Sequence, residues 1–134
     1  MKYGMDIYLT TLDRKKGIIQ FAGAHNSLLI VSPEGTATEL KADNATIGMA
    51  LDKFTHHQTE IQPGSMLYMF TDGYPDQKGG PQNKKFFASE FRKLLASVSA
   101  KEPVEQKERL NQKFSEWKGN KEQMDDVLVI GIRV

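Results

Sequence analysis

The 134-residue chain contains no cysteine, which excludes disulfide bridges and thiolate metal sites and fits a reducing compartment such as the cytoplasm. Its eighteen basic and seventeen acidic residues nearly cancel, so the overall charge gives no reason to expect nucleic acid or an anionic membrane as a partner. No apolar run approaches the roughly 20 residues that a membrane span requires, and we expect no membrane insertion. The length suits one domain, residues 1–134, with its own core.

The chain starts abruptly. Residues 1–6 lead directly into a strand-like pattern, without the charged and apolar regions of a signal peptide. We therefore expect a domain that has been cut from a longer protein.

The first half of the chain is rich in β-forming residues and turn residues. We predict strands over residues 5–12, 18–24, 28–31, 36–40 and 54–61. Glycine-containing turns between them indicate that the first forty residues form an antiparallel meander.

The second half has helical periodicity. The residues Phe87, Phe91, Leu94, Leu95 and Val98 recur on one face of a predicted helix. Pro103 can open a second helix that ends at Gly119, and we assign its apolar stripe to the core: Val104, Leu110, Phe114 and Trp117. Strands, two helices and a returning strand predict an α+β fold, with helices packed on a mostly antiparallel sheet.

A segment between the two halves is rich in glycine and proline. Residues 74–85 contain two prolines and two adjacent glycines, which we expect to prevent regular structure. Such a long loop is either functional or a disordered surface excursion.

Two stretches place acids at the ends of buried strands. Residues 66–70 form an apolar run that is followed by Asp72-Gly73, whereas Asp125-Asp126 precedes the apolar run 127–130. If these strands are antiparallel neighbours, the three carboxylates meet at one sheet edge. Carboxylates repel each other unless a cation lies between them, and an all-oxygen site favours Mg²⁺ or Mn²⁺. The alternative is that these acids are ordinary turn residues.

Five short motifs occur in an order that resembles one family: residues 21–26, 70–73, 79–86, 117–119 and 125–127. They are similar to the SpoIIE/RsbU-type branch of the PPM (PP2C-like) metal-dependent serine/threonine phosphatases. The resemblance implies a β-sandwich with flanking helices and a two-metal Mn²⁺ or Mg²⁺ centre. Asp72 matches the Thr-Asp-Gly ligand and Asp125 the acid of the Asp-Asp motif. We assign both as catalytic metal ligands, with Asp126 as a third ligand.

One family motif has no counterpart in this chain. The family's N-terminal Asp-x-x-Gly-His-Gly-like motif is absent, and Asp6 lacks the glycine and histidine context. The resemblance therefore covers the C-terminal two-thirds of the family domain and implies an N-terminally truncated sandwich. Exposed sheet edge or core in such a fragment would favour self-association.

Several other residues allow two interpretations of their role. His25 is either a general acid or, as we favour, a structural histidine in the second shell of the site, where we also place Gly73. Asp76 is either a second-shell contact or a solvated acid. Lys84 and Lys85 either steer a phosphoprotein substrate to the site or form a solvated pair.

The function that the resemblance implies is hydrolysis of phosphoserine or phosphothreonine by a metal-activated water, in a bacterial, cytoplasmic signalling protein. The implied partners are a phosphorylated regulatory protein of the anti-sigma-factor-antagonist type and an upstream sensor domain, which could be tethered to a membrane. The first alternative is a catalytically inactive regulatory module with the same fold. The second is an unrelated domain that binds a small ligand.

Overall fold

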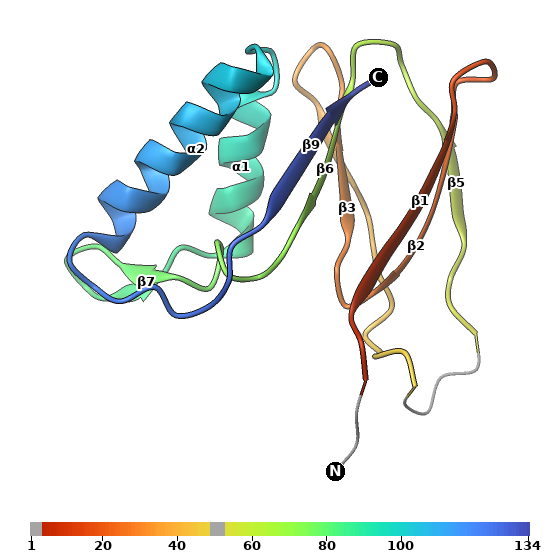
Figure 1. Ribbon diagram of the computed structural model, residues 1–134. Helices are drawn as coiled ribbons and strands as arrows, with labels where there is room; N and C mark the ends of the chain where they lie inside the picture. Colours follow the sequence, from red (N-terminus) through yellow and green to blue (C-terminus); the bar gives the residue numbers. More distant parts are fainter. Residues whose placement is uncertain (1–3, 49–52) are drawn as a thin grey trace.

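The computed structural model describes residues 4–48 and 53–134 of the chain (Figure 1). Its elements follow each other in this order: β1 (Ile7–Asp13), β2 (Ile18–Ala24), β3 (Leu28–Val31), β4 (Ala37–Leu40), β5 (His57–Glu60), β6 (Met66–Phe70), β7 (Lys78–Gly79), β8 (Lys84–Lys85), α1 (Ala88–Val98), α2 (Pro103–Lys118) and β9 (Val129–Arg133). None of the described helices is long and apolar enough to cross a membrane.

The larger strands form a two-layer sandwich with helices on one side (Figure 1). One sheet has the strand order β1-β2-β5 and the other the order β4-β3-β6-β9, and the strand pairs in both are antiparallel. Helices α1 and α2 cover the outer face of the four-stranded sheet. The predicted α+β class, an antiparallel sandwich with flanking helices, is confirmed.

Strands β3 and β6 lie in the middle of the molecule and are covered on both faces. Leu29 and Tyr68 pack with the helices, whereas Ile30 and Leu67 pack against the other sheet. All four residues of β3 and the first three of β6 are buried. This double burial explains why both strands read as continuous apolar runs instead of alternating ones.

The predicted meander is wrong. β2 pairs with β1 and β5, and β3 pairs with β4 and β6, so the chain changes sheets between Ala24 and Leu28. His25 adopts a left-handed φ of 63°, which ends the extended conformation of β2. The two hairpins therefore lie in different layers, and β2 takes its second partner from residues 57–60.

Both predicted helices form. Phe91, Leu95 and Val98 of α1 are buried, and Gly119 ends α2 with a positive φ of 57°. Two assignments to the apolar faces are wrong. Phe87 precedes α1 and is 52% exposed, and Val104 lies in the first turn of α2 and is 69% exposed. Phe87 has a φ of 75° and so cannot continue the helix backward.

Residues 74–85 are more regular than we predicted. β7 and β8 form a short antiparallel ladder, and the segment folds back against the end of α2. The adjacent glycines permit this arrangement instead of preventing it: a Cβ on Gly79 would lie 1.9 Å from the backbone oxygen of Trp117. The reading as a disordered excursion is therefore excluded.

Candidate active site

The predicted pairing of the two acid-bearing strands is correct. β6 and β9 are antiparallel neighbours, with Phe70 opposite Val129 at the end of the ladder. Beyond this pair, the Thr71 amide donates to the Leu128 carbonyl at 3.0 Å. The end of β6 therefore lies beside the segment that precedes β9.

The Thr71 side chain extends this connection to the acid pair. Its hydroxyl donates to the Asp126 carbonyl at 3.1 Å and accepts from the Leu128 amide at 3.0 Å. One hydroxyl thus satisfies two backbone groups of the segment that leads into β9. We refer to these contacts, together with the Gly73 contact described next, as the Thr71 clamp. In the sequence, Thr71 was noted only as part of the Thr-Asp-Gly motif, without a role of its own.

Gly73 is held against the same segment. A Cβ at Gly73 would lie 2.1 Å from the Asp126 carbonyl oxygen, so a larger residue would force the two backbones apart. Thr71 and Gly73 therefore bracket Asp72 and bring it to the backbone of Asp126. The structure thus gives Gly73 a backbone contact at the site, and its assignment to the second shell stays a prediction.

The three carboxylates themselves are exposed and belong to adjoining segments. Asp125 uses one oxygen, Oδ1, to accept the Asp126 amide at 2.7 Å. Over residues 4–48 and 53–134, no group of three or more histidine or acidic side chains is arranged to hold a metal ion. The assignment of Asp72, Asp125 and Asp126 as metal ligands stays a prediction.

A buried glutamine holds the chain just ahead of the acid pair. Gln77 is fully buried; its Nε2 donates to the Glu122 carbonyl at 2.9 Å, and its Oε1 accepts the Met124 amide at 3.2 Å. The backbone carbonyl of Gln77 accepts the Trp117 indole N–H at 2.8 Å. Gln77 therefore positions residues 122–124, although nothing in its sequence context distinguished it from a loop residue.

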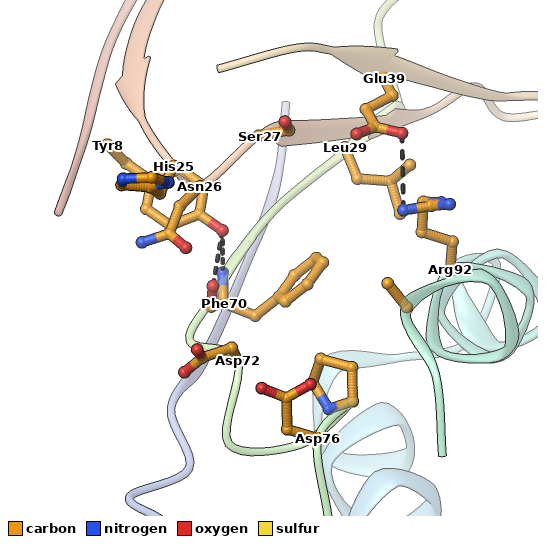
Figure 2. A pocket seen from close by; sticks show the side chains of 12 residues that line it. Tyr8, His25, Asn26, Ser27, Leu29, Glu39, Phe70, Asp72, Asp76 and Arg92 are labelled. Atoms are coloured by element: carbon orange, nitrogen blue, oxygen red, sulfur yellow. Dashed lines mark hydrogen bonds and ion pairs between the residues drawn. The ribbon is translucent and has the colours of Figure 1, made fainter. Parts of the chain in front are cut away.

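A cavity of about 200 Å³ opens beside Asp72, and we call it the site cavity (Figure 2). Its charged lining comprises Asp72, Asp76, Glu39 and Arg92. Arg92 pairs with Glu39 at 3.6 Å, across the cavity from the two aspartates (Figure 2). An anionic substrate would thus meet three carboxylates and one guanidinium, unless a cation offsets the acids.

Tyr8 lines the same cavity from β1. Its hydroxyl donates to the Phe70 carbonyl at 2.6 Å and accepts the Phe70 amide at 3.1 Å. Burial raises the pKa of Tyr8, and the charges of Asp72 and Glu39 act in the same direction, while the hydrogen bond to Phe70 opposes them. Tyr8 therefore remains a neutral hydroxyl that ties the two sheets together at the site.

His25 also lines the site cavity. Its Nε2 lies 3.0 Å from the Thr46 hydroxyl, and its backbone amide donates to the Asp43 carbonyl at 2.9 Å. These contacts support the structural reading, in which His25 holds the crossing between the sheets. Its role as a general acid stays untested.

The two predicted steering lysines lie on the other side of the start of α1. Lys84 and Lys85 form β8 and are exposed. Lys85 pairs with Asp76 at 3.5 Å, so it is connected to the site cavity through that acid. Asp76 thus contributes to the cavity wall and is not simply a solvated acid.

Comparisons with known proteins agree with this architecture. Residues 4–134 match the family model described as Stage II sporulation protein E (SpoIIE). The SiaA-PP2C domain of Pseudomonas aeruginosa aligns with a TM-score of 0.91 and 30% sequence identity, over 98% of this chain and 52% of that one. The phosphatase domain of SpoIIE from Bacillus subtilis aligns with a TM-score of 0.72 and 16% identity, over 97% and 56%.

One curated relative is a much longer protein. Protein IcfG of Synechocystis is 29% identical over 102 residues, which are 73% of this chain and 16% of that protein. The chain thus spans about half the length of the two solved phosphatase domains and a small part of IcfG. Because the family model matches nearly the whole chain, this protein belongs to the SpoIIE family of PP2C-like phosphatase domains.

Proposed function

We propose that this chain is part of a metal-dependent protein phosphatase that hydrolyses phosphoserine or phosphothreonine. The observation that carries the proposal is the Thr71 clamp, which holds the segment bearing Asp125 and Asp126 against Asp72. The site cavity beside Asp72 offers room for a phosphorylated side chain. Without cysteine, the chain has no thiol nucleophile, which fits direct attack by water.

The chemistry of the carboxylates fits a hard divalent cation such as Mn²⁺ or Mg²⁺. Asp72 and Asp125 would supply ligands, with Asp126 beside them. When bound, such a cation supplies positive charge for the phosphoryl oxygens and acidifies water. Because no group of three acids is arranged for a metal within the described residues, we propose that further ligands come from outside this chain.

The residues of this chain then have separate tasks. Thr71 and Gly73 keep the acid segments together, and Gln77 holds the backbone ahead of Asp125. Arg92 would attract the phosphorylated side chain into the site cavity. Tyr8 keeps the floor of that cavity fixed to Phe70.

The absence of a group of three metal-binding side chains among the described residues also favours a second function. A domain whose acids do not complete a metal site could act as a regulatory module that binds the phosphoprotein without hydrolysing it. The two functions share partners. We propose a phosphorylated regulatory protein of the anti-sigma-factor-antagonist type and an upstream sensor domain in a bacterial, cytoplasmic signalling protein.

Calorimetric titration of the chain with Mn²⁺ tests the proposed site. We expect binding that is lost in Asp72→Asn and kept in Glu108→Gln, a matched change of an exposed acid on α2. A phosphothreonine peptide assay in Mn²⁺, with release of inorganic phosphate as the readout, then separates the two functions. Mn²⁺ binding together with hydrolysis of the peptide supports the phosphatase. Mn²⁺ binding without hydrolysis by this chain supports the proposal that further metal ligands come from outside it.

The opposite results are equally clear. Absence of Mn²⁺ binding by the unmutated chain, together with phosphopeptide binding, supports the regulatory module. Equal Mn²⁺ binding by Asp72→Asn and the unmutated chain would exclude Asp72 as a ligand, and the assignment of the site with it.

A further inference from the structure

A second concave surface lies outside the site cavity, between α1, α2 and β8. It has a volume of about 520 Å³ and an apolar floor that includes Phe86, Leu94 and Trp117. Phe86 and Trp117 pack edge to face with their centroids 5.5 Å apart, and the Trp117 indole is fixed by its hydrogen bond to Gln77. The floor is therefore a rigid aromatic surface. We call this surface the lysine groove.

The rim of the lysine groove is strongly basic. Four lysines line it, Lys84, Lys85, Lys93 and Lys113, with Glu90 as its single acidic residue. Lys93 pairs with Glu90 at 2.9 Å and Lys85 with Asp76 at 3.5 Å. No carboxylate among the described residues lies within 4 Å of Lys84 or Lys113. In a chain of nearly balanced charge, this rim is a local excess of cations.

An exposed aromatic residue stands at one end of the groove. Phe87 is 52% exposed and has φ 75° and ψ 143°, a backbone conformation that residues other than glycine rarely adopt. Hydrogen bonds fix it on both sides: its amide donates to the Pro75 carbonyl at 2.8 Å, and its carbonyl accepts the Phe91 amide at 3.0 Å. Strained and rigidly held residues of this kind cluster at ligand-binding surfaces.

The lysine groove adjoins the site cavity. Phe87 and Glu90 line the groove, while the neighbouring Ala88 lines the cavity, so the start of α1 separates the two. The Lys85–Asp76 ion pair joins a wall of each. A protein segment that occupies the groove would therefore continue naturally into the cavity beside Asp72.

We infer that the lysine groove docks an acidic segment of the protein substrate, one that carries apolar side chains for the aromatic floor. The inference rests on the proposed function, because a phosphatase acting on proteins needs contacts beyond the phosphorylated residue. The basic rim complements the acidic side chains of such a segment, and the aromatic floor complements its apolar side chains. A net charge of only +1 argues against the broad basic surface that nucleic acids or anionic membranes require.

The test uses a fluorescein-labelled amphipathic peptide of glutamate and leucine without phosphate, and a matched peptide with glutamine in place of glutamate. Fluorescence anisotropy measures the binding of each to the 134-residue chain. We expect the acidic peptide to bind at least tenfold more tightly than the neutral one. Lys84→Glu/Lys113→Glu should weaken its binding about tenfold or more, and Phe87→Gly should weaken it several-fold while keeping the backbone conformation.

A control double variant carries the same charge change elsewhere. Lys15→Glu/Lys107→Glu alters residues outside the lysine groove and should change the affinity less than twofold. Equal weakening by both double variants would overturn the inference, because the peptide would then be sensing net charge alone. Failure to distinguish acidic from neutral peptide would also overturn it. So would binding of phosphatidylglycerol vesicles through the same lysines with no competition by the peptide.

The docking result is independent of catalysis. Asp72→Asn should leave the peptide affinity within twofold of the unmutated chain, because Asp72 does not line the groove. Peptide binding without Mn²⁺ binding or hydrolysis would support the regulatory module over the phosphatase and leave docking intact. Hydrolysis of a phosphopeptide with no peptide docking would refute only the lysine groove.

Discussion

The two faces of the four-stranded sheet are packed in different ways. The face toward the helices is rich in aromatic residues, and its buried members are Leu29, Val31, Met66, Tyr68, Tyr74, Phe86, Phe91 and Leu95. The face toward the other sheet is mainly aliphatic, with Ile19, Phe21, Leu28, Ile30, Ile61 and Leu67 as its buried members. Among the buried members of these two clusters, only those of the first carry polar groups, namely the hydroxyls of Tyr68 and Tyr74.

Those polar groups fix the position of α2. The Tyr68 hydroxyl donates to Gln106 Oε1 at 2.6 Å, and the Tyr74 hydroxyl donates to the Leu110 carbonyl at 2.8 Å. Between the two sheets the contacts are mainly nondirectional and apolar, and the Tyr8 hydroxyl adds a directional link to Phe70 at the site. Between α2 and the sheet, these side-chain hydrogen bonds supply the orientation.

Truncation of one residue from each face gives the largest expected effects. Phe91→Ala should reduce the free energy of unfolding by about 3–5 kcal/mol. Phe91 is fully buried, with ring centroids 4.2 Å from Tyr74 and 4.8 Å from Phe70. Leu67→Ala on the other face should cost about 2–5 kcal/mol. Urea unfolding measures both, and near-ultraviolet circular dichroism should change strongly for Phe91→Ala alone. A loss below about 1 kcal/mol for Phe91→Ala would contradict this packing.

Alkaline pH should destabilise the helix-covered face selectively. Burial raises the pKa of Tyr68 to about 12 from 10.0, although the charge of Arg133 opposes the shift. Burial also raises the pKa of Tyr74. Because the unfolded chain releases these protons first, stability is intact below pH 10 and falls as the pH rises toward 12. Tyr68 alone should account for about 2–3 kcal/mol.

Urea unfolding at a series of pH values checks this dependence, with Tyr68→Phe as the comparison. The variant should lose a smaller part of its stability between pH 10 and pH 12, because one shifted group is gone. An identical decline in both proteins would show that Tyr68 does not carry the effect.

The pair of Tyr68 and Gln106 tests the role of directional contacts. Gln106 is 4% exposed, and its Nε2 also donates to the Lys101 carbonyl at 2.8 Å. Tyr68→Phe leaves Gln106 Oε1 without its donor and should cost about 1–3 kcal/mol. A double-mutant cycle with Gln106→Leu should give a coupling energy of about 1 kcal/mol. Strictly additive effects would mean that this hydrogen bond does not orient α2.

The sequence predicted the elements that carry strong local patterns. The continuous apolar runs of β3 and β6 and the helical stripe of α1 are such patterns, and each lies within a residue or two of the predicted bounds. The pairing of β2 with β5 was missed because the partner lies more than thirty residues away and residues 54–61 alternate only loosely. Local turns suggested a meander, whereas the partner of β2 is decided by long-range packing.

The candidate site was predicted to a similar extent. The acid positions and the pairing of β6 with β9 followed from where each acid stands relative to a buried run. The Thr71 clamp and the buried Gln77 did not, because Thr71 was noted only as part of the Thr-Asp-Gly motif, without a role of its own, and a glutamine near a proline has no distinctive pattern. Whether the acids suffice for a metal depends on side-chain placement, which no sequence spacing determines.

Phe87 should give the smallest effect, and it marks the limit of the helix-covered core. It lies four residues before Phe91, yet it is half-exposed and strained. Phe87→Gly should relieve about 1–3 kcal/mol of backbone strain. The loss of a half-buried ring costs about 1 kcal/mol, and the added freedom of glycine in the unfolded chain costs about 0.5–1 kcal/mol.

These opposing contributions nearly cancel, so the free energy of unfolding of Phe87→Gly should lie within about 1 kcal/mol of the unmutated chain. Urea unfolding of Phe87→Gly and of Phe91→Ala under the same conditions gives the comparison. A loss of about 3 kcal/mol, like that expected for a buried aromatic, would place Phe87 in the core and remove the reason to assign its exposed ring to the lysine groove. A near-zero change means that relief of backbone strain offsets the lost ring contacts, which leaves the exposed ring of Phe87 available for the contacts proposed in the lysine groove.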